Sequence, residues 1–355
     1  MLYSFKQKSQ DFIVEEILPF KLAWEGDAFF VFFEKRNLNT MDVVNHLCKE
    51  LEISRLTLGI AWLKDKNAIT RQWISIYKSA LKKMWGENKF LNCLSEVARV
   101  IKTDRHTKPI WMTDKISNMF YIRLRANQAV GLKDKENIQK RVTELLEKGF
   151  PNFFGEQRFG INFQNINMGK ELLSGKLHIK EKFETKFKLQ AYASYLFNQF
   201  LNARIHNKRW LLDWDILQYK DSIGVYDLKW KSFSSLSKEH EKNKFFYSPW
   251  ARTELQPYTK DMSVTWPVFG YNTLLCADTT KAGEVEQAFM KKYEVNEKTF
   301  HLYKQLNIFW HRRALRVNPK EILFRFQDDD ILLQFALPGG AYASILVEEL
   351  LKIVQ

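Results

Sequence analysis

The chain has few cysteines, and none of them is spaced like a metal ligand or a redox pair. Its three cysteines, Cys48, Cys93 and Cys276, lie far apart in a sequence of 355 residues. We therefore expect reduced thiols, buried as small hydrophobic groups. The seven histidines show no H-x-x-x-H spacing and no grouping with a cysteine. This pattern argues against a structural metal, and we predict no metal site.

Long apolar runs and phosphate-binding motifs are also missing. No stretch approaches the roughly 18 consecutive apolar residues of a membrane span, and the N-terminus lacks the apolar block of a secretory signal. We therefore expect a cytoplasmic protein with no membrane contact. The sequence has no Walker loop, no G-x-G-x-x-G string and no readable Ser-His-Asp spacing, so we predict no nucleotide cofactor.

What the chain has in excess is positive charge. It carries 55 Lys and Arg residues against 41 Asp and Glu, for a net charge of +14 and a pI near 9.4. Such an excess favours a polyanionic partner, because each neutralised phosphate releases counterions. Residues 78–108 hold eight of the basic residues and three acidic ones, which predicts a phosphate-binding face. The alternative for both features is an ordinary lysine-rich, solvated surface.

The hydrophobic pattern predicts a mixed α and β fold, and the length favours two domains. The unbroken apolar run 29–33 indicates a strand covered on both faces. Composition changes near residue 175, where a segment rich in Trp, Phe, Tyr and Lys begins. We therefore predict one domain formed by 1–177 and 313–355, interrupted by an insertion at 178–312. Further strands are expected at 72–78 and 120–125, a hairpin at 321–336, a charged loop at 232–244, and helices near 39–51, 137–148, 182–199, 284–293 and 343–354.

Residues 62–72, W-L-K-D-K-N-A-I-T-R-Q, place one carboxylate between two lysines. The field of Lys64 and Lys66 favours the ionised form of Asp65, which could act as a nucleophile or a base. Gln72 could donate a hydrogen bond to this carboxylate or to a bound ring. The alternative is a solvated surface turn, because charge clusters usually lie in such turns.

A second string, N-F-F-G-E-Q-R-F-G at 152–160, combines aromatic rings with amide and guanidinium groups. A splayed-out base stacks on an aromatic face and is hydrogen-bonded at its edge, so Phe154, Asn152, Gln157 and Arg158 are candidate binding residues. The alternative is ordinary core packing, in which the string's two glycines, at 155 and 160, have positive φ.

Together the two strings resemble the tRNA pseudouridine synthase D (TruD) family. Three further places agree with the family's pattern. Lys6 and D-F-I-V-E-E (11–16) match near the N-terminus, and L-P-G-G-A-Y-A-S (337–344) matches near the C-terminus. Between them, R-H at 105–106 and N-x-F at 118–120 also match. The resemblance therefore covers nearly the whole chain.

The resemblance implies an isomerase that converts uridine to pseudouridine in RNA without a cofactor. Asp65 matches the catalytic aspartate, Phe154 the aromatic residue that stacks on the target base, and Asn152 lies beside it. Lys6 and Glu16 match active-site neighbours. The implied fold is a pseudouridine-synthase catalytic domain of the α+β class, with a mixed, largely antiparallel sheet and an inserted family-specific α/β lobe. The implied substrate is uridine 13 in the D arm of tRNA, and we expect a monomer.

The chain also departs from the family pattern, at Trp62, Ser117 and Glu348, where the family has Gly, Gly and Arg. An alternative function is therefore a non-catalytic basic RNA-binding protein with a site altered by Trp62. A metal-dependent nuclease would need clustered carboxylates, but Asp328–Asp330 fit a turn. The sequence leaves open whether Asp65 attacks C1′, attacks C6 or removes the C2′ proton.

Overall fold

The computed structural model describes residues 2–61, 64, 66–83, 86–111, 114, 116–206, 212, 215–219, 246–247 and 262–352. The chain divides into two compact units. The first contains residues 1–143, 319–339 and 351–355, and the second contains 144–318 and 340–350. The predicted insertion at 178–312 lies within the second unit, which extends beyond it at both ends.

The described part of the first unit contains one sheet of nine strands in the order β14-β15-β7-β2-β5-β3-β6, with β1 added to β7 and β4 to β5. The β2–β5 pair is parallel and the other pairs are antiparallel. The prediction of an α+β fold with a mixed, largely antiparallel sheet is confirmed. The strands are β1 (Tyr3–Ser4), β2 (Phe12–Ile17), β3 (Ala28–Arg36), β4 (Leu58–Gly59), β5 (Ile69–Tyr77), β6 (Arg99–His106), β7 (Ser117–Ala126), β14 (Lys320–Gln327) and β15 (Asp330–Pro338).

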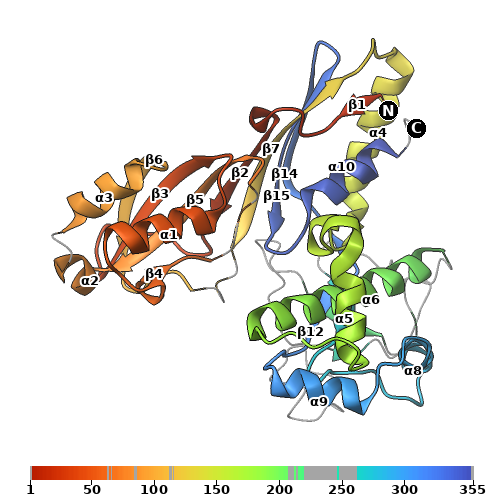
Figure 1. The fold of residues 1–355 in the computed structure, drawn as a ribbon. Coiled ribbons are helices and arrows are strands. Elements are labelled where there is room, and N and C mark those ends of the chain that lie inside the picture. Colours follow the sequence, from red (N-terminus) through yellow and green to blue (C-terminus); the bar gives the residue numbers. More distant parts are fainter. Residues whose placement is uncertain are drawn as a thin grey trace. The chain divides into compact units, whose positions relative to one another are not determined.

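The apolar run in β3 is buried on both faces, as predicted. Phe29, Val31 and Phe33 pack against helices α1 (Thr40–Glu50) and α3 (Glu87–Ser95), while Phe30 and Phe32 pack on the opposite face. Figure 1 shows α1 lying across the strands of this half of the sheet. The helices of this half are α1 (Thr40–Glu50), α2 (Lys78–Lys83) and α3 (Glu87–Ser95).

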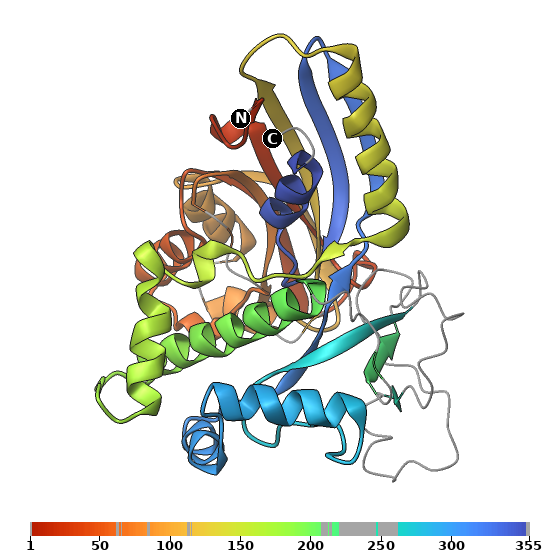
Figure 2. The same ribbon diagram turned by 90° about the vertical axis from the view of Figure 1, so that its right-hand side faces the viewer.

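The β14–β15 hairpin forms the opposite edge of the sheet, and its turn includes Asp328 at a φ of 56°. Helix α4 (Leu132–Lys148) begins five residues before the predicted start and lies alongside β14 and β15 (Figure 2). Lys135 on this helix pairs with Asp329 in the turn at 2.8 Å. Gly149 follows α4 with a φ of 67°, the left-handed conformation that is usual just after the C-terminus of a helix.

The second unit is built around α6 (Lys182–His206), which extends seven residues beyond its predicted end. This helix is buried on most of its sides, since its apolar residues contact α5 (Gln164–Leu173) and the strand β11 (Met262–Val268). Helix α5 crosses it (Figure 2). The remaining elements are β8 (Phe150–Pro151), α5 (Gln164–Leu173), β9 (Ile216–Tyr219), β10 (Phe246–Tyr247), β11 (Met262–Val268), α8 (Lys281–Lys292), α9 (Glu297–Gln305), β12 (His311–Ala314), β13 (Arg316–Val317) and α10 (Ala343–Leu351).

The cysteines are free thiols, as predicted, although burial differs among them. Cys93 and Cys276 are buried and Cys48 is half-buried. In the part of the chain that the structure describes, no helix combines the length and the apolar character needed to cross a bilayer. The predicted charged loop at 232–244 lies outside the described residues.

Candidate active site

The predicted catalytic residue Asp65 lies outside the described residues, but the preceding residue, Lys64, is described and is held at several points. Its ammonium pairs with the Glu16 carboxylate at 2.9 Å and donates to the Asn118 side-chain oxygen at 2.7 Å. Its backbone N–H donates to the Thr40 hydroxyl at 3.0 Å. Both the side chain and the main chain next to Asp65 are therefore anchored.

The strand register explains why Glu16 and Asn118 meet at Lys64. Glu16 near the end of β2 lies opposite Asn118 on the antiparallel strand β7. The second carboxylate oxygen of Glu16 accepts a hydrogen bond from the backbone N–H of Trp73 at 2.9 Å. The buried carboxylate thus has a counter-charge and a backbone N–H donor, and burial of a carboxylate is costly without such partners.

Gln72 belongs to the same network. Its side chain is buried, and its amide oxygen accepts a hydrogen bond from the Thr40 hydroxyl at 2.9 Å. Thr40 is the first residue of α1, so the start of this helix connects β5 to the main chain at Lys64. The sequence identified Asn118 only as part of a matched motif. The structure adds Asn118 as a candidate functional residue of the first unit, because its side chain contacts Lys64.

Lys6 lies at the other end of β2. Its ammonium is 3.8 Å from the centroid of the Phe12 ring, and its backbone has a φ of 58°. Phe12 and Glu16 are four residues apart on one strand, which corresponds to about 13 Å. Phe120, two residues after Asn118, is buried and stacks on Phe335 with ring centroids 5.5 Å apart.

The second string, 152–160, leaves β8 and is bound in the second unit by α6 and β12. The backbone N–H of Phe154 donates to the Asn198 side-chain oxygen at 2.8 Å, and the Phe154 carbonyl accepts from the Asn198 amide at 2.9 Å. The Phe154 ring meets Phe197 edge-on at 5.5 Å and Tyr342 at 6.2 Å. The ring is half-buried, so part of it remains open.

Asn152 is turned inward. It is buried, its amide donates to the Ala314 carbonyl at 2.9 Å, and its side-chain oxygen accepts from Arg313 at 2.6 Å. Gln157 is exposed, whereas Arg158 is half-buried and donates to the Gln190 side-chain oxygen at 3.4 Å.

The glycines of this string have two different explanations. Gly160 has a φ of 76°, as expected, but the expectation of positive φ at Gly155 is wrong, because its φ is −71°. A Cβ at position 155 would lie 2.6 Å from the Tyr342 ring, so a close contact explains this glycine.

A guanidinium lies against the Phe154 ring. The Arg313 guanidinium carbon lies 4.0 Å from the Phe154 ring centroid. Burial lowers the pKa of Arg158.

The basic segment 78–108 presents most of its charge to solvent. Lys102 on β6 also lies over the rings of Phe32 and Trp73, and Arg105 pairs with Glu87 at 2.8 Å. The exposed basic residues are Lys82, Lys83, Lys89, Arg99, Lys102 and Lys108. This exposure suits contact with a polyanion, and a solvated surface would show it equally. The tryptophans of the middle segment, at 210, 214, 230 and 250, lie outside the described residues.

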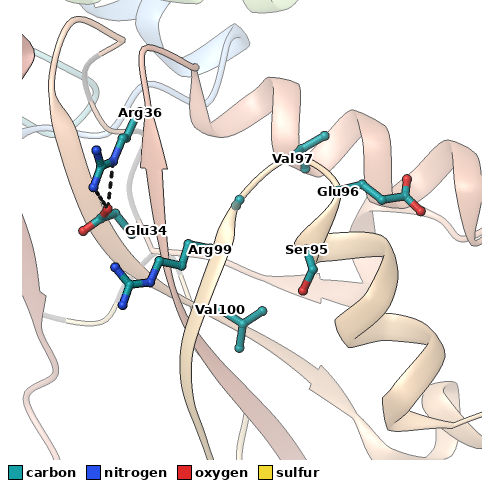
Figure 3. A pocket seen from close by; sticks show the side chains of 8 residues that line it. Glu34, Arg36, Ser95, Glu96, Val97, Arg99 and Val100 are labelled. Carbon is teal, nitrogen blue, oxygen red and sulfur yellow. Dashed lines mark hydrogen bonds and ion pairs between the residues drawn. The ribbon is translucent and has the colours of Figure 1, made fainter.

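A pocket of about 620 Å³ opens beside β3 and the turn after α3 (Figure 3). Its lining includes Arg99, Glu34 and Arg36. The Arg36 guanidinium pairs with the Glu34 carboxylate at 2.8 Å. None of the predicted site residues lines it.

One group of potential metal ligands is present among the described residues. His46, Cys93 and Glu96 have ligand atoms within 4.8 Å of one another. His46 Nε2 already lies 3.1 Å from the Glu96 carboxylate and 3.2 Å from the Cys93 carbonyl oxygen. Contacts of the imidazole with the Glu96 carboxylate and the Cys93 carbonyl oxygen account for this arrangement, and none of the predicted site residues takes part in it.

Comparisons with known proteins agree with the resemblance seen in the sequence. A crystal structure of a TruD candidate from Methanosarcina mazei has the same fold, with a TM-score of 0.64 and 21% identity, covering 99% of this chain and 93% of that one. The fold is therefore that of a pseudouridine synthase. The family model described as "tRNA pseudouridine synthase D (TruD)" matches residues 3–185 and 181–350.

Curated relatives extend this likeness over nearly the whole sequence. A tRNA pseudouridine synthase D from Sulfurimonas denitrificans is 29% identical over 99% of this chain and 95% of its own length. Another from Shewanella oneidensis is 30% identical over 96% of this chain and 84% of its own length. The chain belongs to the tRNA pseudouridine synthase D family, and it is an isomerase.

Proposed function

We propose that this chain converts uridine 13 in the D arm of tRNA to pseudouridine, with Asp65 as the essential carboxylate. The observation that carries the proposal is the anchoring of Lys64 by Glu16, Asn118 and Thr40. A catalytic group gains from a fixed position, because orientation removes entropy from the barrier. The motif that contains Asp65 is thus tied to the strands β2 and β7 and to the start of α1.

The reaction rearranges one nucleoside. The glycosidic bond between C1′ and N1 breaks, the uracil turns, and a bond forms between C1′ and C5. The proton on C5 is lost and N1 gains one, so atoms and charge balance without an oxidant or a reductant. A carboxylate can support this sequence as a nucleophile at C1′ or C6, or as a base at C2′.

The base itself needs a surface on which to stack. Phe154 is our first candidate, because its half-buried ring is held by Phe197, Tyr342 and Arg313. Phe120 is a second candidate, because it follows Asn118 by two residues on β7 and shares its face of the strand. The exposed lysines of segment 78–108 would hold the phosphate backbone.

The test is Asp65→Asn. We expect this variant to fold and to bind tRNA with an affinity close to that of the wild-type protein, yet to make no pseudouridine. Carbodiimide-based mapping of the product RNA identifies both the activity and the position of the modified uridine. Asp278→Asn, at an exposed position of the second unit, is the matched control and should remain active. An active Asp65→Asn enzyme would refute the assignment, and modification elsewhere in tRNA would refute only the choice of uridine 13.

The alternative of a non-catalytic RNA-binding protein is not favoured by any described contact. Family membership indicates an enzyme, and the Lys64 anchor is present. The monomeric state and the cytoplasmic location remain predictions.

A further inference from the structure

Arg313 on β12 is the residue most closely tied to the string that contains Phe154. Its Nε donates to the Asn152 carbonyl oxygen at 3.0 Å, and one terminal nitrogen donates to the Asn152 side-chain oxygen at 2.6 Å and to the Phe153 carbonyl at 3.4 Å. The other terminal nitrogen donates to the Gly340 carbonyl at 2.9 Å. The guanidinium therefore joins the 152–154 backbone to the segment 337–344.

The same guanidinium covers one face of the Phe154 ring. Its carbon lies 4.0 Å above the ring centroid and 5.6 Å from that of Phe197. Phe197 and Tyr342 meet the ring at 87° and 64°, so neither of them stacks flat on it. A flat ligand therefore cannot stack on the face that Arg313 covers.

We propose that Arg313 is a positioning residue for the Phe154 platform, which fixes the ring and keeps the target base off the face that it covers. This inference depends on the proposed function, because it gives Phe154 its substrate. It also gives a role to the motif 337–344, which supplies the Gly340 carbonyl to Arg313 and the Tyr342 ring to Phe154.

A planar guanidinium suits this position better than an ammonium. It can stack on an aromatic face while its donors point outward in its own plane. A lysine keeps the charge and can keep a cation–π contact, but it cannot donate in three fixed directions. Glutamine loses both features. The expected order of activity is therefore wild type, then Arg313→Lys, then Arg313→Gln.

The experiment is a double-mutant cycle between Arg313→Gln and Phe154→Leu, read in kcat and in KM for tRNA. Arg313→Gln alone should lower kcat about 10-fold, the scale of one base–aromatic stack, and leave KM within about 3-fold. In the Phe154→Leu background, Arg313→Gln should lower kcat further by less than about 2-fold, because a residue that acts through the ring has nothing left to position. Independent effects of the two changes on kcat would overturn the proposal.

Arg316→Gln is the matched control. Arg316 also donates to two carbonyl oxygens, those of Lys148 and Gly149. It should leave kcat unchanged and show no coupling to Phe154. If Arg313→Gln does not fold, Arg313→Lys takes its place in the cycle, with a smaller expected loss that must again vanish in the Phe154→Leu background.

The wild-type protein is assayed first, which separates the two claims. If it makes no pseudouridine, the proposed function is wrong, and the cycle is then read in dissociation constants for tRNA. Coupling between positions 313 and 154 in those constants would still support the positioning role, and additive effects would overturn it.

Discussion

Glu16 and Lys64 form an ion pair of 2.9 Å in the interior of the first unit, with side chains that are 1% and 6% exposed. They come from β2 and from the residue before Asp65, so the pair joins a strand of the central sheet to the motif with the proposed catalytic residue. A charge at such depth is stable only with its partner, because desolvation of a single ion costs several kcal/mol.

We therefore expect Glu16→Gln to lower the free energy of unfolding by about 3–5 kcal/mol, since the Lys64 ammonium stays buried without its counter-charge. Pseudouridine formation by the folded fraction should also fall. Urea titration followed by circular dichroism measures the first effect, and product mapping measures the second. Glu15→Gln is the control, because the Glu15 side chain is 31% exposed and pairs with Arg71. A Glu16→Gln protein as stable as this control would contradict the role of the pair.

The two aromatic candidates should respond differently to replacement by leucine. Phe154→Leu should lower kcat about 10- to 100-fold with little change in the melting temperature, because a half-buried ring is lost from a stacking surface. Phe120→Leu should lower the free energy of unfolding by about 1–3 kcal/mol, since Phe120 is buried against Phe335. Calorimetry and steady-state kinetics on both variants separate the two roles. The reverse result would make Phe120 the stacking residue.

Binding of tRNA should weaken with salt through the exposed lysines of the basic segment. Each phosphate contact contributes about 0.7–0.9 to the slope of log K against log salt. The double variant Lys82→Gln, Lys83→Gln should therefore reduce the slope by about one to two units, as measured by filter binding. The pair Lys170→Gln, Lys176→Gln removes the same charge from the second unit at exposed positions. An equal reduction of the slope by both double variants would indicate attraction by the overall positive charge instead of phosphate contacts at the basic segment.

The sequence predicted the local elements because their causes are local. The run in β3 is apolar over consecutive residues, and the start of α1 is marked by Asn39, whose N–H donates to the Asp42 carboxylate at 3.0 Å. The predicted start of α4 and the predicted end of α6 were less accurate. The middle of α6 is buried on several sides, so one-sided periodicity does not show how far the helix continues.

The contacts of the site could not be predicted, because they depend on residues far apart in the chain. Lys64 and Asn118 are separated by 54 positions, and Arg313 and Asn152 by 161. The one available signal for Arg313 was a pair of adjacent arginines in a short strand. Adjacent strand residues face opposite sides, and Arg312 accordingly turns to Glu286 while Arg313 turns to Asn152.

Asn198 makes the position of the Phe154 backbone depend on the helical phase of α6. Its side-chain amide pairs with both the N–H and the carbonyl of Phe154, much as a neighbouring strand would. Deleting one residue earlier in α6 would rotate Asn198 by about 100° around the helix axis and separate it from both groups. Lineages that lengthen or shorten this protein should therefore do so in its loops, and keep the count of residues along α6 ahead of Asn198 constant.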